Sequence, residues 1–380
     1  MGPIQSSEVG PDRSSELIMT SRGTARTIGG LCAVLLLWSM LAAAQVQLSD
    51  ENAYNPIPSP DGSKIAAVRA GWGYWGTGLG RSNLTSELIV LDLAGHLSSP
   101  KPLGIGFVAD WGGAGIVSFR DWSYALLSAD GAVLQRGHVC AGPTIRHPMP
   151  TRCAERVVYV TSAHAFISVS QEFGNQALVT SRADFSTHHH GKDLDDLLAL
   201  SPDERYVAVG PDRPRRVLSV YDAHGKAWVD MGEVIVSPDR GWRYMEPSWD
   251  PWFADSSQLA FFADEGLVVS SPDGRHRRVV LHTREPAGLA VPSPDGRLIA
   301  YATFASRPAA ANAMGNLPVW NCTGIWVVGT QASAEPVRVA GPSPESTLDL
   351  RWLGNERLIF DRVEEGFPPK ARVWLADVPR

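Results

Sequence analysis

A four-residue phrase, Ser-Pro-Asp-Gly, recurs along this chain, and an apolar run typical of a β-strand follows each copy. Copies begin at Ser59 and Ser293, and the variant Ser-Pro-Asp-Glu begins at Ser201. Proline presets a φ of about −65° at the second turn position, aspartate accepts hydrogen bonds from the backbone ahead of it, and glycine readily adopts a positive φ. The phrase therefore predicts a tight turn between two strands, repeated at corresponding points of the chain.

Repeats of about 40–50 residues with strands on both sides are typical of β-propellers, in which each unit is one four-stranded blade. We name the strands of a blade A to D from the axis outwards, so that the phrase joins A to B. A second set of turns, such as Ser271-Pro272-Asp273-Gly274, joins C to D. The 380 residues, with 36 glycines and 28 prolines, suit one large all-β domain. The sequence predicts a seven-bladed β-propeller, with six blades as the alternative if the weak third unit is misread.

The apolar runs assign strands to seven successive units. In chain order, the expected strands are 65–68 and 88–91; 115–119, 124–128 and 132–135; 156–161, 165–170 and 177–180; 206–209, 216–221 and one near Trp228; 258–263, 266–270 and 278–281; 298–303, 324–328 and 336–339; and 357–363 and 371–377.

The last unit lacks a fourth strand, whereas residues 45–48 alternate in polarity and have no blade of their own. We expect residues 45–48 to pair onto the last blade as its outer strand. Closing the ring in this way removes two strand edges that would otherwise be exposed.

These repeats resemble the TolB-like, WD40-like propeller repeats of bacterial envelope proteins. The resemblance is carried by the Ser-Pro-Asp phrases and by two degenerate copies of the usual Trp-Ser-Pro-Asp start, Trp249-Asp250-Pro251 and Arg351-Trp352. It implies a propeller over most of the chain and an envelope location, with a possible envelope complex as partner. The chain departs from the pattern where Pro58, Leu200 and Pro292 replace the tryptophan, and it has no room for the separate N-terminal domain of TolB. The role of TolB itself is therefore not transferred.

The N-terminus has the three parts of a secretory signal peptide. Arg22 and Arg26 precede an apolar stretch at residues 28–44, and Ala42-Ala43-Ala44 offers a cleavage site before Gln45. We predict that residues 1–44 are a signal peptide, with Met19 as a possible true start, and that residues 45–380 form the propeller. The alternative is an uncleaved anchor in the inner membrane, because about 17 apolar residues is the short limit of a span. The mature protein is expected in the periplasm or outside the cell.

Three cysteines remain after removal of that segment. In an oxidising compartment Cys140 and Cys153 could close a short proline-containing loop as a disulfide, and three buried thiols, Cys322 included, are the alternative. The net charge of −6 and the lack of a basic face argue against nucleic acid as a partner.

The long insertions fall in the B–C and D–A connections, which share one face of a propeller. They are residues 71–86, 140–150, 182–196, 236–247 and 305–322. Loops on a rigid scaffold commonly carry binding residues, and aromatic side chains favour protein, peptide or carbohydrate contacts. The hypothesis is a ligand-binding surface on this face; the alternative is that the rings fold inward and cap the blade ends. Its candidate ligand-binding residues are Trp72, Tyr74, Trp75, Trp242, Tyr244 and Trp320.

Several motifs fail as evidence of chemistry. The glycines of Gly71-Trp72-Gly73-Tyr74-Trp75-Gly76 match a dinucleotide-binding pattern, but no helix is predicted after them. The run His188-His189-His190 with three nearby aspartates is interpreted as a solvated loop, since adjacent side chains diverge, so we predict no metal and no cofactor. The triplets beginning at Asn83 and Asn321 match glycan acceptors by chance.

The residues also give little support for enzymatic activity. The nucleophile-elbow pattern G-x-S-x-G is absent from the sequence. A glycosidase needs two carboxylates about 5–9.5 Å apart, and Glu246, Asp250, Asp255 and Asp264 are candidates that serve equally well in turns. The leading interpretation is an exported propeller that binds or scaffolds, with no catalytic residue assigned. The alternative is an exported lyase or glycoside hydrolase with its site in the central depression of the loop-rich face.

Overall fold

The computed structural model describes residues 45–49, 52–70, 86–93, 101–105, 107–120, 123–137, 152–161, 165–172, 175–180, 190–191, 197–210, 216–222, 228–235, 249–307, 319–331, 333–347, 349–364 and 370–379. The chain divides into two units, Met1–Ala42 and Ala43–Arg380, and all the described strands belong to the second. No helix in the described part of the chain is long and apolar enough to cross a membrane.

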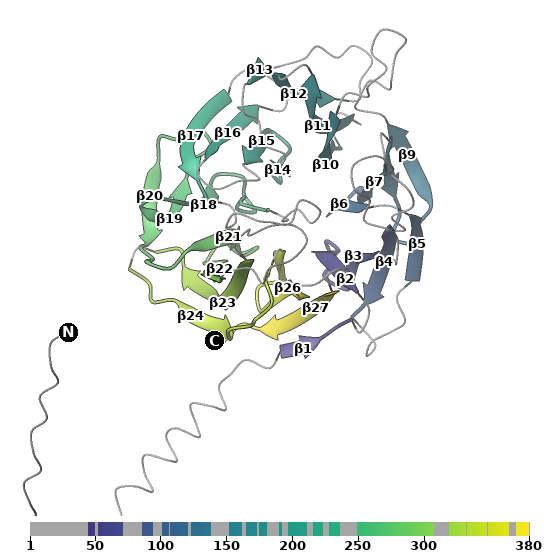
Figure 1. Ribbon diagram of the computed structural model, residues 1–380. Helices are drawn as coiled ribbons and strands as arrows, with labels where there is room; N and C mark the ends of the chain where they lie inside the picture. Colours follow the sequence, from purple (N-terminus) through teal and green to yellow (C-terminus); the bar gives the residue numbers. More distant parts are fainter. Residues whose placement is uncertain are drawn as a thin grey trace, which may run out of the picture. The chain divides into compact units, whose positions relative to one another are not determined.

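Over the described residues, the strands form seven antiparallel sheets arranged in a ring, as a propeller requires (Figure 1). From the inner to the outer edge, the blades contain β2 (Ala53–Pro58), β3 (Lys64–Ala70), β4 (Ser86–Asp92) and β5 (Lys101–Ile105); β6 (Phe107–Gly112), β7 (Gly115–Arg120), β8 (Ser123–Leu127) and β9 (Val133–Gly137); β10 (Arg152–Val160), β11 (Ala165–Glu172), β12 (Asn175–Thr180) and β13 (His190–Gly191); β14 (Leu197–Leu200), β15 (Tyr206–Gly210), β16 (Arg216–Asp222) and β17 (Trp228–Val234); β18 (Leu259–Ala263), β19 (Gly266–Ser270) and β20 (Arg277–Leu281); β21 (Ala287–Pro292), β22 (Leu298–Arg307), β23 (Val319–Gly329) and β24 (Val337–Ala340); and β25 (Leu350–Leu353), β26 (Arg357–Glu364), β27 (Lys370–Asp377) and β1 (Gln45–Gln47).

The expected closure of the ring by the first strand is confirmed. Strand β1 pairs antiparallel with β27, and Gln45 lies opposite Ala376. Side chains reinforce this junction, because Arg362 Nη2 donates to Gln45 Oε1 at 2.7 Å and the backbone N–H of Ala371 donates to Asn52 Oδ1 at 2.6 Å. Residues from both ends of the folded chain therefore share one blade.

The Ser-Pro-Asp phrases form the A–B turns that they predict. In the first, Ser59 Oγ donates to Asp61 Oδ1 at 2.6 Å and accepts the backbone N–H of Lys64 at 3.0 Å. Gly62 has a φ of 68°, the left-handed conformation that glycine adopts most readily. The hydrogen bonds from Ser59 and Ser63 lower the pKa of Asp61 to about 2.

Two blades depart from the expected pattern. The third unit begins with β10 as its innermost strand and gains β13, which lies inside residues expected to be a D–A loop. In the fifth blade the innermost strand is reduced to a single bridge between Trp252 and Leu259. Pro251 lies beside that bridge and has no N–H for a ladder, although its carbonyl accepts the N–H of Ala260 at 2.8 Å.

The core lies between the blades, so both faces of most sheets are covered. Every residue of β18 is buried, as is every residue of β21, which is why these strands are apolar without alternation. Between the last two blades, Phe304 and Ile325 pack against Trp352 and Phe360. Burying a side chain of this size contributes about 1.5–3 kcal/mol, so packing between blades holds the ring together.

Candidate functional site on the propeller axis

Charged residues from three separate blades meet near the axis. Asp110 belongs to β6, Arg351 to β25, and Asp250 precedes the bridge that replaces the innermost strand of the fifth blade. Arg351 Nη1 lies 2.8 Å from Asp250 Oδ2, and the two side chains are 12% and 47% exposed. This ion pair joins the fifth and seventh blades past the sixth, and Asp250 is its accessible member.

Buried tryptophans fix the backbone beside these charges. The indole N–H of Trp352 donates to the carbonyl of Val291 at 2.8 Å, and that of Trp252 donates to the carbonyl of Ala199 at 2.9 Å. Each bond reaches the innermost strand of the preceding blade. Arg351 directly precedes Trp352, and Asp250 lies two residues before Trp252, so the tryptophans anchor the segments that present the ion pair.

Asp110 lies in the electrostatic field of this pair. Burial raises the pKa of Asp110, while Arg351 lowers it and Asp250 raises it. The backbone N–H of Trp111 donates to Asp110 Oδ1 at 2.8 Å and favours the carboxylate. Burial dominates, and Asp110 therefore keeps its proton to a higher pH than an ordinary aspartate.

Two further buried aspartates belong to the seventh blade. Asp349 and Asp361 are 1% and 0% exposed. The backbone N–H of Asp349 donates to Asp361 Oδ1 at 3.0 Å, and the N–H of Asp361 donates to the Asp349 carbonyl at 3.2 Å. Asp349 directly precedes β25, two residues before Arg351.

We call the set Asp110, Asp250 and Arg351 the axial site. It offers carboxylate acceptors, one guanidinium donor and one carboxyl group with a raised pKa. Within the described residues, no three His, Cys, Asp or Glu side chains are grouped in a way that could hold a metal ion. The described site therefore combines hydrogen-bond acceptors with one guanidinium donor.

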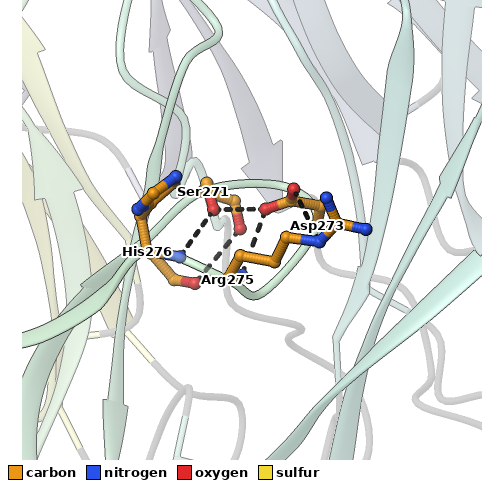
Figure 2. Close-up of polar contacts among 5 residues, drawn as sticks. Ser271, Asp273, Arg275 and His276 are labelled. Atoms are coloured by element: carbon orange, nitrogen blue, oxygen red, sulfur yellow. Dashed lines mark hydrogen bonds and ion pairs between the residues drawn. The ribbon is translucent and has the colours of Figure 1, made fainter.

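Figure 2 shows a second polar group, in the C–D turn of the fifth blade, whose residue types could be mistaken for a catalytic triad. Ser271 Oγ donates to Asp273 Oδ1, but the backbone N–H of His276, not its ring, donates to Ser271 Oγ at 3.0 Å. Ser293 and Asp295 form the same arrangement in the sixth blade. The group is recurrent turn chemistry, and nothing in it activates the serine.

The candidate aromatic residues fall mainly outside the described residues. Trp72, Tyr74, Trp75, Trp242 and Tyr244 all do so. Trp320 lies in β23, opposite Ser306, rather than in a loop, because β22 and β23 extend further than expected. Its ring is partly buried against the core between the sixth and seventh blades, and its indole N–H has no hydrogen-bond partner among the described residues. Ligand binding by these six residues stays a prediction.

The other residues singled out from the sequence are dispersed. Asp255 accepts hydrogen bonds from the N–H and hydroxyl of Ser257, at 3.0 and 2.8 Å, and Asp264 is exposed in a hairpin. His190 lies in β13, whereas Glu246, His188, His189 and Asn83 lie outside the described residues.

The cysteines and the second glycan triplet can be placed only in part. Cys153 belongs to β10, and Cys140 lies outside the described residues, so their disulfide stays a prediction. Cys322 is a free thiol, and burial raises its pKa. Asn321 lies beside it in β23.

Sequence reasoning found Asp250 only as one of several loose candidates, and it missed the roles of Asp110 and Arg351. The position of the two charged residues in the repeats is the sequence signal that could have identified them. Asp110 precedes Trp111, and Arg351 precedes Trp352, each just before an A–B turn. Each is a charge in an innermost strand, where an apolar residue would otherwise be expected.

No protein-family model matches the chain, and no curated protein is similar to it in sequence. Among solved structures, an oligogalacturonate lyase in complex with manganese is similar, with a TM-score of 0.55 and 12% identity over 89% of this chain and 94% of that one. A putative TolB from Agrobacterium tumefaciens has a TM-score of 0.39 and 12% identity, covering 87% of this chain and 92% of that one. TolB from Acinetobacter baumannii has a TM-score of 0.39 and 11% identity, covering 96% and 72%. The chain has the β-propeller fold that its turn repeats predict.

Proposed function

We propose that this protein is an exported propeller that binds a protein, peptide or carbohydrate ligand at the axial site. The observation that carries the proposal is the ion pair between Arg351 and Asp250, with Asp110 in its field. Residues brought together from three blades form a site that no single repeat could provide.

Stability alone does not account for this arrangement. An ion pair with one half-exposed partner contributes about 0–1 kcal/mol, whereas taking a guanidinium out of water costs several kcal/mol before its attractions are counted. Asp110 adds a buried carboxyl group without a directly bonded cation among the described contacts. A ligand that hydrogen-bonds to Asp250 and Arg351 gives these charges a role that blade packing does not.

The test is direct binding to a panel of peptides and oligosaccharides, followed by calorimetry on each hit. Asp250→Asn removes the accessible charge at the axis, and Asp264→Asn makes the same chemical change at an exposed hairpin. We expect Asp250→Asn to weaken binding at least about tenfold, because a charge-assisted hydrogen bond is lost, and Asp264→Asn to leave binding unchanged. Equal affinities for both variants would place the ligand away from the axis.

One observation favours the second candidate, an exported lyase or glycoside hydrolase. Asp110 has a raised pKa near the carboxylate of Asp250 and the guanidinium of Arg351, as a general acid requires. The structurally similar oligogalacturonate lyase supports a test of the same reaction class here. Incubation with acidic and neutral oligosaccharides, with products followed by mass spectrometry, should show cleavage that Asp110→Asn abolishes. Cleavage that persists in this variant would exclude Asp110 as the acid.

Export is part of the proposal and is tested separately. The sequence predicts a signal peptide at residues 1–44, so the mature chain is expected to begin at Gln45 in the periplasm or outside the cell. Mass spectrometry of the N-terminal peptide from fractionated cells measures both the first residue of the mature chain and its location. A chain that keeps residues 28–44 and stays with the inner membrane would favour the anchored alternative.

A further inference from the structure

We propose that Arg351 passes from Asp250 to Asp110 when Asp110 loses its proton, and that this exchange frees the carboxylate of Asp250. The inference names a regulation of the axial site and rests on the proposed function for its purpose, although the exchange itself needs no ligand. Three observations support it: the exposure of Asp250, the burial of the Asp110 carboxyl group, and an unused donor on Arg351.

Asp250 is the partner that Arg351 can release at little cost. Its Oδ2 lies 2.8 Å from Arg351 Nη1, and its side chain is 47% exposed, whereas that of Arg351 is 12% exposed. Water solvates an exposed carboxylate well, so an ion pair with such a partner contributes little to stability. Asp250 therefore keeps a favourable environment after the guanidinium has left.

Asp110 has the opposite character, because its carboxyl group is shielded from water. Burial is the main cause that raises its pKa, and its carboxyl group accepts one hydrogen bond within the described structure, from the N–H of Trp111 to Oδ1 at 2.8 Å. A charge that is held away from water needs a cation or several donors to stabilise it. Once ionised, Asp110 therefore competes for the guanidinium more strongly than Asp250 does.

Arg351 has a donor available for Asp110. Its Nε is buried and has no hydrogen-bond partner in the described part of the chain, although buried N–H groups are normally satisfied. The backbone beside it is fixed, because Arg351 pairs with Ile359 between β25 and β26, and the indole of Trp352 donates to Val291. The exchange therefore requires a movement of the arginine side chain alone.

The surroundings of Asp110 leave these three residues as the members of the exchange. Among the described residues, the charged groups that act on the pKa of Asp110 are Arg351, which lowers it, and Asp250, which raises it. Strands β2, β3, β4, β7 and β10 pack against β6. The titratable side chains described on those strands do not act on Asp110, and they are Tyr54, Lys64, Arg69, Glu87, Asp92 and Tyr159.

The direction of the pH dependence follows from these charges. At low pH Asp110 is neutral and Arg351 stays with Asp250, which is the pairing that the structure shows. As the pH rises through the pKa of Asp110, the new negative charge attracts the guanidinium and repels Asp250. A ligand at the axial site then meets a free carboxylate in place of a neutral ion pair.

The test is a double-mutant cycle for Arg351 and Asp250, measured by urea unfolding of the full-length protein between pH 5 and pH 9. The cycle uses Asp250→Asn, Arg351→Gln and the double variant, and it is repeated in the backgrounds Asp110→Asn and Asp264→Asn. In the parent and in the Asp264→Asn background, the coupling between Arg351 and Asp250, expressed as a ratio of unfolding constants, should fall at least about threefold as the pH rises. In the Asp110→Asn background the coupling should keep its low-pH value throughout.

A coupling that does not change with pH in the parent overturns the exchange, as does a fall of equal size in the Asp110→Asn background. If Arg351→Gln does not fold, crystal structures of the full-length protein at pH 5 and pH 9 decide the same question. Arg351 should contact Asp250 in the first and Asp110 in the second, and the same partner at both values overturns the inference. Neither measurement includes a ligand, so failure of the exchange leaves the proposed binding function intact, and a failed binding panel does not affect the exchange.

Discussion

The hydroxyl of Ser256 accepts a hydrogen bond from the backbone N–H of Asp203 at 2.9 Å. This bond joins the A–B turns of the fourth and fifth blades. Ser256 has a φ of 60°, an unusual conformation for a residue other than glycine. Glu204, with a φ of 59°, accepts the N–H of Thr161 from the third blade at 2.8 Å. Side chains at this turn position therefore link neighbouring blades, which explains why glycine does not occupy it in every repeat.

This link gives the first prediction. Ser256→Ala should lower the free energy of unfolding by about 1–2 kcal/mol, because it removes the acceptor and keeps the strained φ. Ser256→Gly should cost less, since glycine relieves the backbone while losing the same hydrogen bond. Denaturant unfolding of both variants measures the difference. A larger loss for the glycine variant would show that the positive φ of Ser256 carries no strain.

The second prediction concerns the tryptophan that anchors Arg351. Trp352→Phe should destabilise the fold by about 1–3 kcal/mol, because the buried carbonyl of Val291 loses its donor. Trp374→Phe is the matched control, since the indole N–H of Trp374 has no hydrogen-bond partner in the described part of the chain. Thermal unfolding should give a clearly lower Tm for Trp352→Phe than for Trp374→Phe. Similar values would mean that ring volume, and not the hydrogen bond, governs this position.

The third prediction tests ring closure. Deleting residues 45–47 removes β1 and exposes the edge of β27, where Leu375 and Ala376 lose their partners. We expect a lower Tm and increased aggregation, measured by calorimetry and light scattering. Val46→Lys should have little effect, because the Val46 side chain is 52% exposed and the strand pairing is kept. A deletion variant as stable as the parent would contradict the role of β1 in closure.

The fourth prediction is a pH dependence that comes from Asp110. Its pKa is raised in the folded state, so its contribution to stability is present at low pH and declines as pH rises above the ordinary value of 3.8. Asp110→Asn mimics the protonated group and should be more stable relative to the parent at pH 8 than at pH 4. Urea unfolding at the two values measures this. A stability difference that does not change with pH would contradict the raised pKa.

The extent of sequence prediction follows from the range of the interactions involved. Ser59, Asp61 and Gly62 form a turn through contacts within a few residues, so their pattern could be recognised directly. The pairing of β1 with β27 could be predicted from a missing strand at one end and a spare strand at the other. Even so, the short β13 gave no clear apolar signal, and Pro251 interrupted a ladder that the repeat pattern implied.

The axial site could not be predicted in the same way, since its residues are far apart in the sequence. Asp110, Asp250 and Arg351 meet only because three innermost strands approach one axis. The residue types alone do not predict that these three side chains come close together. The same limit applies to Trp320, which was assigned to a loop because the outward extension of β22 and β23 depends on their mutual pairing.

The junction between β1 and β27 also sets the order in which the protein can be completed. Because β1 and β27 lie in the same blade, the ring remains open until Lys370–Asp377 has been synthesised. Arg351 belongs to that same blade, so the axial site is completed only when the last blade forms.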